Sequence, residues 1–115
     1  MKHSVGKVIA PATLTELFKV PAGYKAEVST LFASNHQGNN KWITMYWQHA
    51  HDANHKIYVV TEFVISANNY LQFSDSMVMQ SGDSIWVITE AVSDMSGMAS
   101  FDLYKEAQTV AFEGE

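Results

Sequence analysis

Apolar and polar residues alternate in short runs along this chain, and clusters of glycine, asparagine, aspartate and serine separate the runs. Alternation with a period of two is typical of strands that bury one face, and turn-forming clusters at intervals of about ten residues are typical of all-β domains. Helical spacing is missing from the pattern. The sequence therefore predicts seven or eight antiparallel strands, over Thr13–Val20, Tyr24–Ser34, Trp42–Ala50, Lys56–Glu62, Tyr70–Phe73, Met77–Met79, Ser84–Ala91 and Met98–Glu106.

These runs predict a single all-β domain, a two-sheet antiparallel β-sandwich. Seven or eight strands in about 95 residues match an immunoglobulin-like or a jelly-roll sandwich, and the pattern does not choose between the two topologies. The 115 residues suffice for one such core and are too few for two ordinary domains. We place the sandwich at residues 12–106. An N-terminal arm at 1–11 and a C-terminal tail at 107–115 lack the strand pattern and are expected to become ordered on a partner.

The composition narrows the range of partners. Seven basic residues, all lysine, stand against twelve acidic residues and give a formal net charge of -5. Phosphate recognition relies on arginine and on a positive face, so we expect no nucleic-acid partner. The sequence has no cysteine, which excludes a disulfide scaffold and a thiolate metal site. No run resembles a membrane span or the apolar centre of a signal peptide, so we expect a soluble protein, not secreted by the usual route, without a membrane partner.

The sequence does not contain the arrangements that are typical of enzymes. Serine, histidine and aspartate residues fall in turns, without the G-x-S-x-G context that exposes a nucleophile. Asp83 is interpreted as a turn residue whose carboxylate accepts hydrogen bonds from nearby backbone amides. The isolated turn glycines do not form a phosphate cradle. We therefore expect a protein that is not an enzyme and uses no cofactor.

One segment has the spacing of metal ligands. His49 and His51 would project from the same face of an extended strand, and two imidazoles so placed can share a metal ion. A third ligand could come from Asp52, from His55 or from a symmetry-related copy. The alternative is a solvated turn in which these histidines bond to backbone groups or water.

Several strands are apolar on both faces, although a sandwich needs only one apolar face on each strand. We interpret the second set of aromatic residues as an interface between subunits. Packing under loops of the same chain is one alternative, and a platform for sugar rings beside Asn39, Asn40 and Gln48 is another. Trp47 and Trp86 are predicted to lie in the core. The interface candidates are Trp42, Tyr46, Tyr58, Phe63 and Tyr70.

Two turn motifs carry a resemblance to a known class of proteins. The segment TLTELFKVPAGYKAEVSTLFASN at residues 13–35 joins two strands through a VPAG turn. The segment VMQSGDSI at residues 78–85 leads through a GDS turn into a later strand. This order, with a tryptophan- and tyrosine-rich strand between the two motifs, resembles small virion structural proteins of tailed bacteriophages.

The resemblance implies a β-sandwich subunit of a virion that is assembled in the host cytoplasm. Such a subunit would occur in symmetric copies, as a head decoration or as part of the neck, tail or fibre. Its partners would be copies of itself and other virion proteins, and no catalytic residues come with the resemblance. The alternative is a carbohydrate-binding module that holds a host surface glycan with the same aromatic residues, since fold alone does not fix function.

Overall fold

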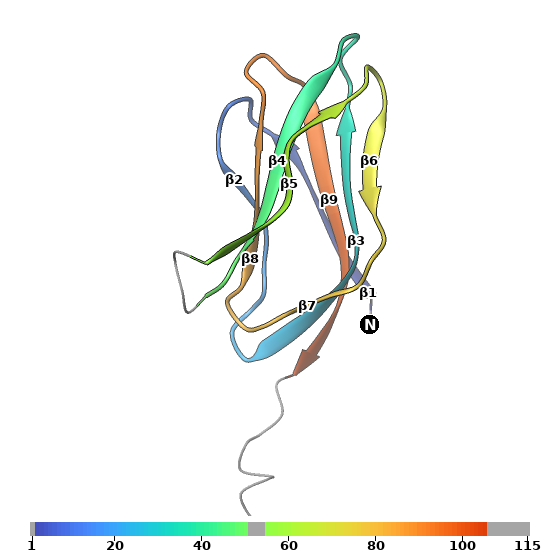
Figure 1. The fold of residues 1–115 in the computed structure, drawn as a ribbon. Coiled ribbons are helices and arrows are strands. Elements are labelled where there is room, and N and C mark those ends of the chain that lie inside the picture. Colours follow the sequence, from blue (N-terminus) through green and yellow to red (C-terminus); the bar gives the residue numbers. More distant parts are fainter. Residues whose placement is uncertain (1, 51–54, 106–115) are drawn as a thin grey trace, which may run out of the picture.

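The computed structural model describes residues 2–50 and 55–105, which form nine β-strands (Figure 1). The all-β prediction is confirmed, with one or two strands more than the pattern indicated. Within the described residues there is no helix that is long and apolar enough to cross a membrane. The strands are β1 (Lys2–Ile9), β2 (Thr15–Lys19), β3 (Tyr24–Asn35), β4 (Lys41–Gln48), β5 (Lys56–Ile65), β6 (Tyr70–Phe73), β7 (Met77–Met79), β8 (Ser84–Thr89) and β9 (Met95–Lys105).

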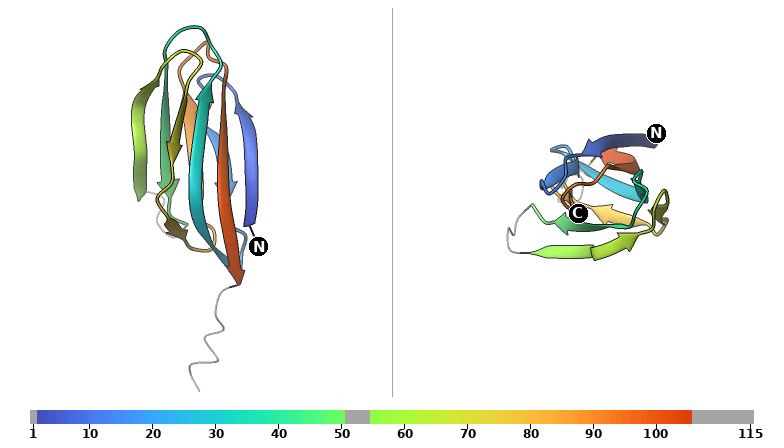
Figure 2. Two further views of the ribbon diagram at one scale, coloured as in Figure 1. Left: turned by 90° about the vertical axis from the view of Figure 1, so that its right-hand side faces the viewer. Right: turned by 90° about the horizontal axis from the view of Figure 1, so that it is seen from above.

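The strands form two antiparallel sheets that pack face to face (Figure 2). Sheet A has the order β1-β9-β3-β6, and β7 also pairs with β3, so that β6 and β7 follow one another along the same side of β3. Sheet B has the order β2-β8-β4-β5. The sheet edges are therefore β1 and the β6–β7 side in sheet A, and β2 and β5 in sheet B.

The strand pairing is nested, and this nesting identifies the sandwich as a jelly roll. β4 pairs with β5, β3 with β6 and β7, β2 with β8, and β1 with β9, as in the two arms of one long hairpin. Rolling this hairpin places β9 against β3 and β8 against β4, which completes both sheets. Two Greek keys that share two four-stranded layers make a jelly roll, whereas an immunoglobulin domain has a different strand order.

The core lies between the two sheets and follows the alternation of the sequence. Ile43 and Met45 on β4 are buried, and so are Ile85 and Val87 on the neighbouring β8, where Val87 stands opposite Met45 and Ile85 opposite Trp47. The rings of Phe18 in sheet B and Phe101 in sheet A approach to 4.1 Å between centroids and join the two layers. β4 lies between β8 and β5 and is therefore an interior strand of sheet B.

The prediction of an N-terminal arm at residues 1–11 is wrong, because residues 2–9 form the edge strand β1. This strand pairs with β9 from Lys2 opposite Asp102 to Ile9 opposite Met95. Ile9 is buried and Val5 packs against the core, but the other side chains of β1 are exposed. Five of the eight residues of this edge strand are polar or glycine, which gives a weak alternation signal, and pairing with β9 makes it a strand. The predicted tail at 107–115 lies outside the described residues.

Two strand boundaries also differ from the pattern. β9 begins at Met95 rather than Met98, because Ser96 and Gly97 pair with β1 on one side and with β3 on the other. β5 continues past Glu62 to Ile65, after an irregularity in its pairing with β4. In both places a neighbouring strand overrides the local turn signal.

The VPAG and GDS turns lie side by side at one end of the sandwich. Each places a glycine at a positive φ, 83° at Gly23 and 84° at Gly82, a conformation that residues with a Cβ atom rarely adopt. The backbone N–H of Val20 donates to the carbonyl of Asp83 at 2.9 Å, and the N–H of Gly82 donates to the carbonyl of Val20 at 3.1 Å. The two sequence motifs therefore form one structural unit.

We expect Gly82→Ala to lower the free energy of unfolding by about 1–3 kcal/mol. The added Cβ would lie 2.9 Å from the Cβ atom of Ala50, and the positive φ adds strain. Gly38→Ala is the matched control, because nothing lies within 4 Å of a Cβ atom there. Urea unfolding of both variants measures the difference, and equal losses would contradict this account of the GDS turn.

Candidate interaction surfaces

The outer face of sheet B carries aromatic residues where a sandwich usually presents polar side chains to water. Trp86, Tyr46 and Tyr58 are cross-strand partners on β8, β4 and β5, and they form a row across the sheet. Trp42 and Val64 are partners in a second row. We call the following set the sheet-B face: Trp42, Tyr46, Tyr58, Val64, Trp86 and Ile88.

Contacts within the chain fix the aromatic row. The rings of Tyr46 and Tyr58 lie 5.4 Å apart, and the Lys56 ammonium lies 5.1 Å from the centroid of the Tyr46 ring. The indole nitrogen of Trp86 donates to the Ser84 hydroxyl at 2.8 Å. Tyr46 is only 7% exposed, whereas Tyr58 is 53% exposed. A partner on this face would therefore meet the Tyr58 ring before the Tyr46 ring.

β5 forms the open edge of sheet B beside this face. It is ten residues long, and its exposed large apolar side chains are those of Ile57, Tyr58, Phe63 and Val64, which are between 40% and 55% exposed. Water covers these groups unless another chain does. Exposed apolar edges are places where proteins pair with other chains.

A bulge pushes one part of β5 away from the regular ladder. Between Val60 and Phe63, two residues of β5 stand where β4 has only Thr44. Glu62 takes up the extra length with a φ of 43°, and its backbone N–H donates to the Thr44 hydroxyl at 2.7 Å. We call Thr61–Val64 the β5 bulge segment, and all four of its residues are exposed. Bulges of this kind re-aim side chains at sheet edges.

The structure brings together three of the five predicted interface residues, Trp42, Tyr46 and Tyr58, on the sheet-B face. Phe63 on β5 is the register partner of the core residue Ile43 and lies on the opposite face of the strand. Tyr70 lies on β6 in sheet A, where its ring stacks on Phe32 at 5.3 Å. Tyr46 contributes little surface, for the reason given above. Sequence reasoning missed Val64, although it lies beside Trp42 in the ladder. The extension of the apolar run beyond Glu62 was the available signal.

Trp86 also differs from its prediction, since it lies on the sheet-B face and not in the core. On β8 the side chains of Ile85 and Val87 are buried, and Trp86, which stands between them, points to the opposite face of the sheet. A strand that is apolar on both faces gives no periodic signal for which face turns inward. Trp47 faces inward as predicted and packs against the core.

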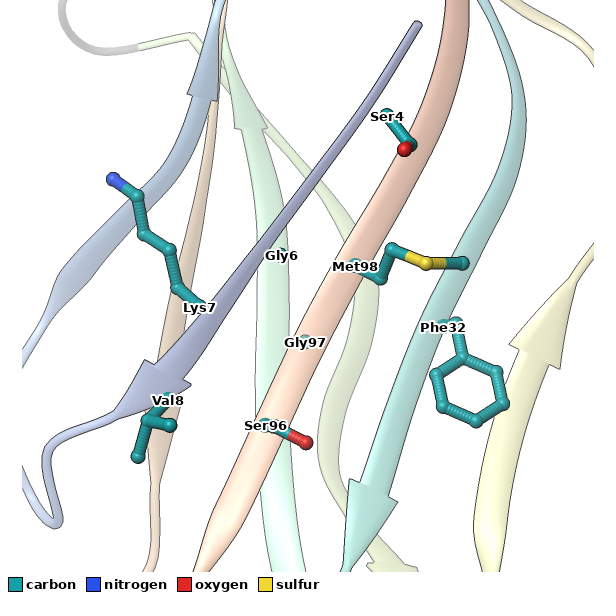
Figure 3. Close-up of a pocket in the computed structure, with 8 residues that line it drawn as sticks. All are labelled: Ser4, Gly6, Lys7, Val8, Phe32, Ser96, Gly97 and Met98. Carbon is teal, nitrogen blue, oxygen red and sulfur yellow. The ribbon is translucent and has the colours of Figure 1, made fainter.

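Sheet A carries a hollow of about 400 Å³ on its outer side (Figure 3). Two small residues, Gly6 on β1 and Ser96 on β9, leave space in its floor, beside the longer side chain of Met98, which stands opposite Gly6. In Figure 3, Val8 lies on the β1 side of the hollow and Phe32 on the β3 side. We call this space the sheet-A hollow, and it is lined chiefly by Ser4, Gly6, Val8, Phe32, Ser96 and Met98.

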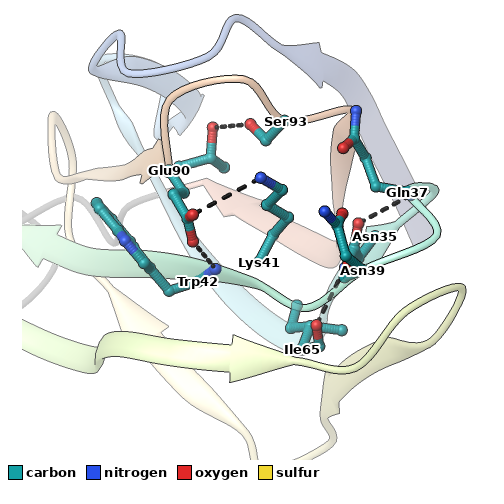
Figure 4. Close-up of polar contacts among 9 residues, drawn as sticks. Asn35, Gln37, Asn39, Lys41, Trp42, Ile65, Glu90 and Ser93 are labelled. Carbon is teal, nitrogen blue, oxygen red and sulfur yellow. Dashed lines mark hydrogen bonds and ion pairs between the residues drawn. The ribbon is translucent and has the colours of Figure 1, made fainter.

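Polar contacts fix the loops where β4 begins and β5 ends (Figure 4). The buried Asn35 side chain donates to the carbonyl of Ile65 at 3.0 Å. The Glu90 carboxylate accepts the backbone N–H of Trp42 at 3.1 Å and lies 3.7 Å from the Lys41 ammonium. The chain therefore sets the position of Trp42 and of the end of β5 by itself.

At the opposite end, a buried carboxylate joins the GDS turn to the end of β4. Asp83 is 1% exposed and accepts three hydrogen bonds, each of 3.0 Å, from Trp47 Nε1 and from the backbone N–H groups of Ala50 and Gln80. His49 Nδ1 lies 3.7 Å from the same carboxylate. The predicted role of Asp83 as an acceptor for backbone amides is confirmed.

The predicted metal pair is only partly described. His49 lies against the ring of Trp47 at 5.0 Å and against that of His55 at 4.5 Å. Its predicted fellow ligand, His51, lies outside the described residues. Within residues 2–50 and 55–105, no group of three or more histidine, aspartate or glutamate side chains is arranged to hold a metal ion. The pair stays a prediction.

Two of the polar residues expected beside a sugar platform are used within the chain. Asn40 Oδ1 accepts the backbone N–H of Ala67 at 3.2 Å. Gln48 Nε2 lies within 3.3 Å of the carbonyl of His49. The aromatic row is consequently better suited to an apolar partner surface than to a ring with many hydroxyl groups.

No protein-family profile matches this chain, and no curated protein matches it. Among solved structures, it is similar to a subunit from a study of Bacillus endospore appendages, described as disulfide-linked pili, with a TM-score of 0.52 and 12% identity over 93% of this chain and 87% of that one. A chain of the Gx strain of infectious bursal disease virus matches with a TM-score of 0.47 and 8% identity, and this protein spans 30% of its length. At such identities, the similarity to the appendage subunit establishes the β-rich sandwich fold alone.

Proposed function

We propose that this protein is a non-enzymatic structural subunit that assembles with copies of itself and with neighbouring proteins. One observation carries the proposal: large apolar side chains are exposed on an open edge strand that adjoins an aromatic sheet face. Aromatic residues with little charge are typical of interface centres. Contiguous exposed apolar patches on single chains mark interaction surfaces.

The other edge strands have features that hinder pairing with another chain, and β5 has such features only in part. β1 carries Lys2 and Lys7, β2 is five residues long, and β6 and β7 are four and three residues long. Lysines and short strands keep edges from pairing with other chains. β5 has a bulge, but it leaves four large apolar side chains in water. A neighbouring chain is therefore the expected cover for this edge.

The proposed location is the virion of a tailed bacteriophage, as a head decoration or as a component of the neck, tail or fibre. This part of the proposal rests on the VPAG and GDS segments that resemble phage structural proteins. The similarity of the fold to a pilus subunit supports an assembly role, and the jelly roll is an architecture used by viral capsid domains. The other virion proteins would then be its neighbours.

We expect Tyr58→Ser to weaken self-association by about tenfold or more, since a central aromatic side chain is typically worth over 1.4 kcal/mol at an interface. The melting temperature should change little, because Tyr58 is more than half exposed. Size-exclusion chromatography with light scattering over a dilution series measures the self-association of the wild type and of the variant. Tyr104→Ser, at a tyrosine on β9 that is 48% exposed, is the matched control.

A wild-type protein that stays monomeric at every concentration would contradict the proposal. If such a monomer also changed its tryptophan fluorescence with polysaccharide, the glycan-binding alternative would be favoured instead. Trp42→Ala gives a second measurement on the same face. It should weaken assembly and leave melting nearly unchanged if Trp42 meets a partner.

A further inference from the structure

Resting on the proposed function, we propose that neighbouring copies of this chain exchange their first strands, so that β1 of one copy pairs with β9 of the next. β1 begins at Lys2 and forms one edge of sheet A, where it pairs with β9 and with no other strand of the described residues (Figure 2). A terminal element of this kind can be replaced by the identical element of another copy. The exchange links two chains without a new recognition surface.

Apart from this pairing, little holds β1 on the sandwich. Of its eight residues only Ile9 is buried and Val5 is partly buried, so the strand removes little apolar surface from water when it docks. Its contact with β2 includes a hydrogen bond of 2.6 Å from the Lys7 ammonium to the carbonyl of Glu16. Segments with few buried contacts open more readily than the core. Each copy offers the same partners, so a strand from a neighbour makes the same contacts.

The turn that follows β1 is strained. The backbone N–H of Thr13 donates to the carbonyl of Ala10 at 3.2 Å, and Pro11 and Ala12 are the two central residues of this turn. Ala12 has a φ of 55°, at a position where turns with a positive φ normally have glycine. A residue with a Cβ atom loses free energy in this left-handed conformation. Opening of the turn removes the strain, and short strained hinges favour the exchange of elements between copies.

The hinge between β1 and β2 can extend between two copies. It consists of residues 10–14, all of which are exposed, and five extended residues span up to about 17 Å. Pro11 favours an extended conformation at the residue before it. Extension breaks the bond of 3.1 Å from the Ala12 N–H to the carbonyl of Thr89, but water replaces the partners of exposed backbone groups. The hinge therefore opposes the exchange only weakly.

An engineered disulfide shows which copy supplies β1, because the sequence contains no cysteine of its own. Ser4 on β1 and Ser100 on β9 are register partners, and the Cα atoms of such partners lie about 4.5–5.5 Å apart, within the range of a disulfide. The test variant combines Ser4→Cys with Ser100→Cys. The matched control combines Thr30→Cys with Ser100→Cys, because Thr30 is the partner of Ser100 on β3, a strand that is not exchanged.

Oligomer and monomer fractions from size-exclusion chromatography are oxidised and run on a denaturing gel without reductant. The Ser4–Ser100 pair is expected to link chains to one another in the oligomer fraction and to form internal disulfides in the monomer fraction. The control pair is expected to form internal disulfides in both. Thermal melting verifies the fold of each variant, and if the test pair unfolds the protein, Val8→Cys with Ser96→Cys joins the same two strands.

A change in the hinge gives a second measurement. Ala12→Gly is expected to weaken the exchange by about fivefold, because glycine adopts a positive φ without strain and stabilises the closed turn. Ala10→Gly is the control, since the φ of Ala10 is not positive. Oligomers of the Ser4–Ser100 variant that contain only internal disulfides would overturn this inference and leave the proposed function standing. Persistent monomers of the wild type would instead remove the proposed function as well.

Discussion

Asp83→Ala is expected to lower the free energy of unfolding by about 3–5 kcal/mol, because it leaves several polar groups without their acceptor. The indole N–H of Trp47 and the backbone N–H groups of Ala50 and Gln80 all donate to this carboxylate. An unpaired buried donor costs about 1–3 kcal/mol. The same bonds tie the GDS turn to the end of β4, so their loss also loosens the end of the sandwich where the VPAG turn lies.

Urea unfolding followed by tryptophan fluorescence and by circular dichroism measures this loss. Asp83→Asn should cost less than the alanine variant, because the amide keeps one oxygen acceptor and nearly the same volume. Asp75→Ala is the control, at an exposed bend, and should stay within about 0.5 kcal/mol of the wild type. Equal stabilities for Asp83→Ala and Asp75→Ala would show that the carboxylate has no structural role.

The second large effect is expected at Trp47, where alanine should cost about 3–5 kcal/mol. Its side chain packs against the core from β4, and its indole nitrogen donates to Asp83. Trp86→Ala should cost clearly less, about 1–2 kcal/mol, since that ring lies on the outer face and leaves no cavity between the sheets. Trp47→Phe separates the two contributions, because it keeps an aromatic ring and removes the donor.

The two tryptophan variants also decide the orientation of β8. If Trp86→Ala destabilised the protein as much as Trp47→Ala, Trp86 would have to face the core as the sequence pattern suggested. A smaller loss at Trp86, together with weaker self-association, would agree with its place in the aromatic row. Both quantities come from the same purified variants, by unfolding and by light scattering.

The strands with strict alternation were predictable from the sequence, and those without it were only partly so. β3 lies in the interior of sheet A, and its buried residues alternate on either side of one irregularity. β4 is interior too, but four consecutive residues, from Ile43 to Tyr46, are buried in it. β8 has apolar residues on both faces, so its position was predictable but its orientation was not. β1 has too few apolar residues for a local signal, because pairing with β9 rather than burial makes it a strand.

The two candidate interaction surfaces also differ in how far the sequence predicts them. Aromatic residues on β4 and β5 were visible as a second apolar set, because their sequence positions alternate with core residues. The sheet-A hollow had no local signal, since Gly6 and Ser96 come from opposite ends of the sequence and meet only through the register of β1 with β9. The jelly-roll order likewise depends on which distant runs pair, and composition does not specify such pairing.

The nested order of the strands has a consequence for how the chain is made. β1 pairs with β9 alone, so the first strand to be synthesised has to wait for the last strand of the described chain. Contacts between such distant residues close long loops and are slow to form. On the ribosome, β4 and β5 can meet early, while β1 and the side of β3 that faces β9 stay unpaired until Met95–Lys105 has emerged. The floor of the sheet-A hollow is therefore completed last, after β4 and β5 of sheet B have been able to pair.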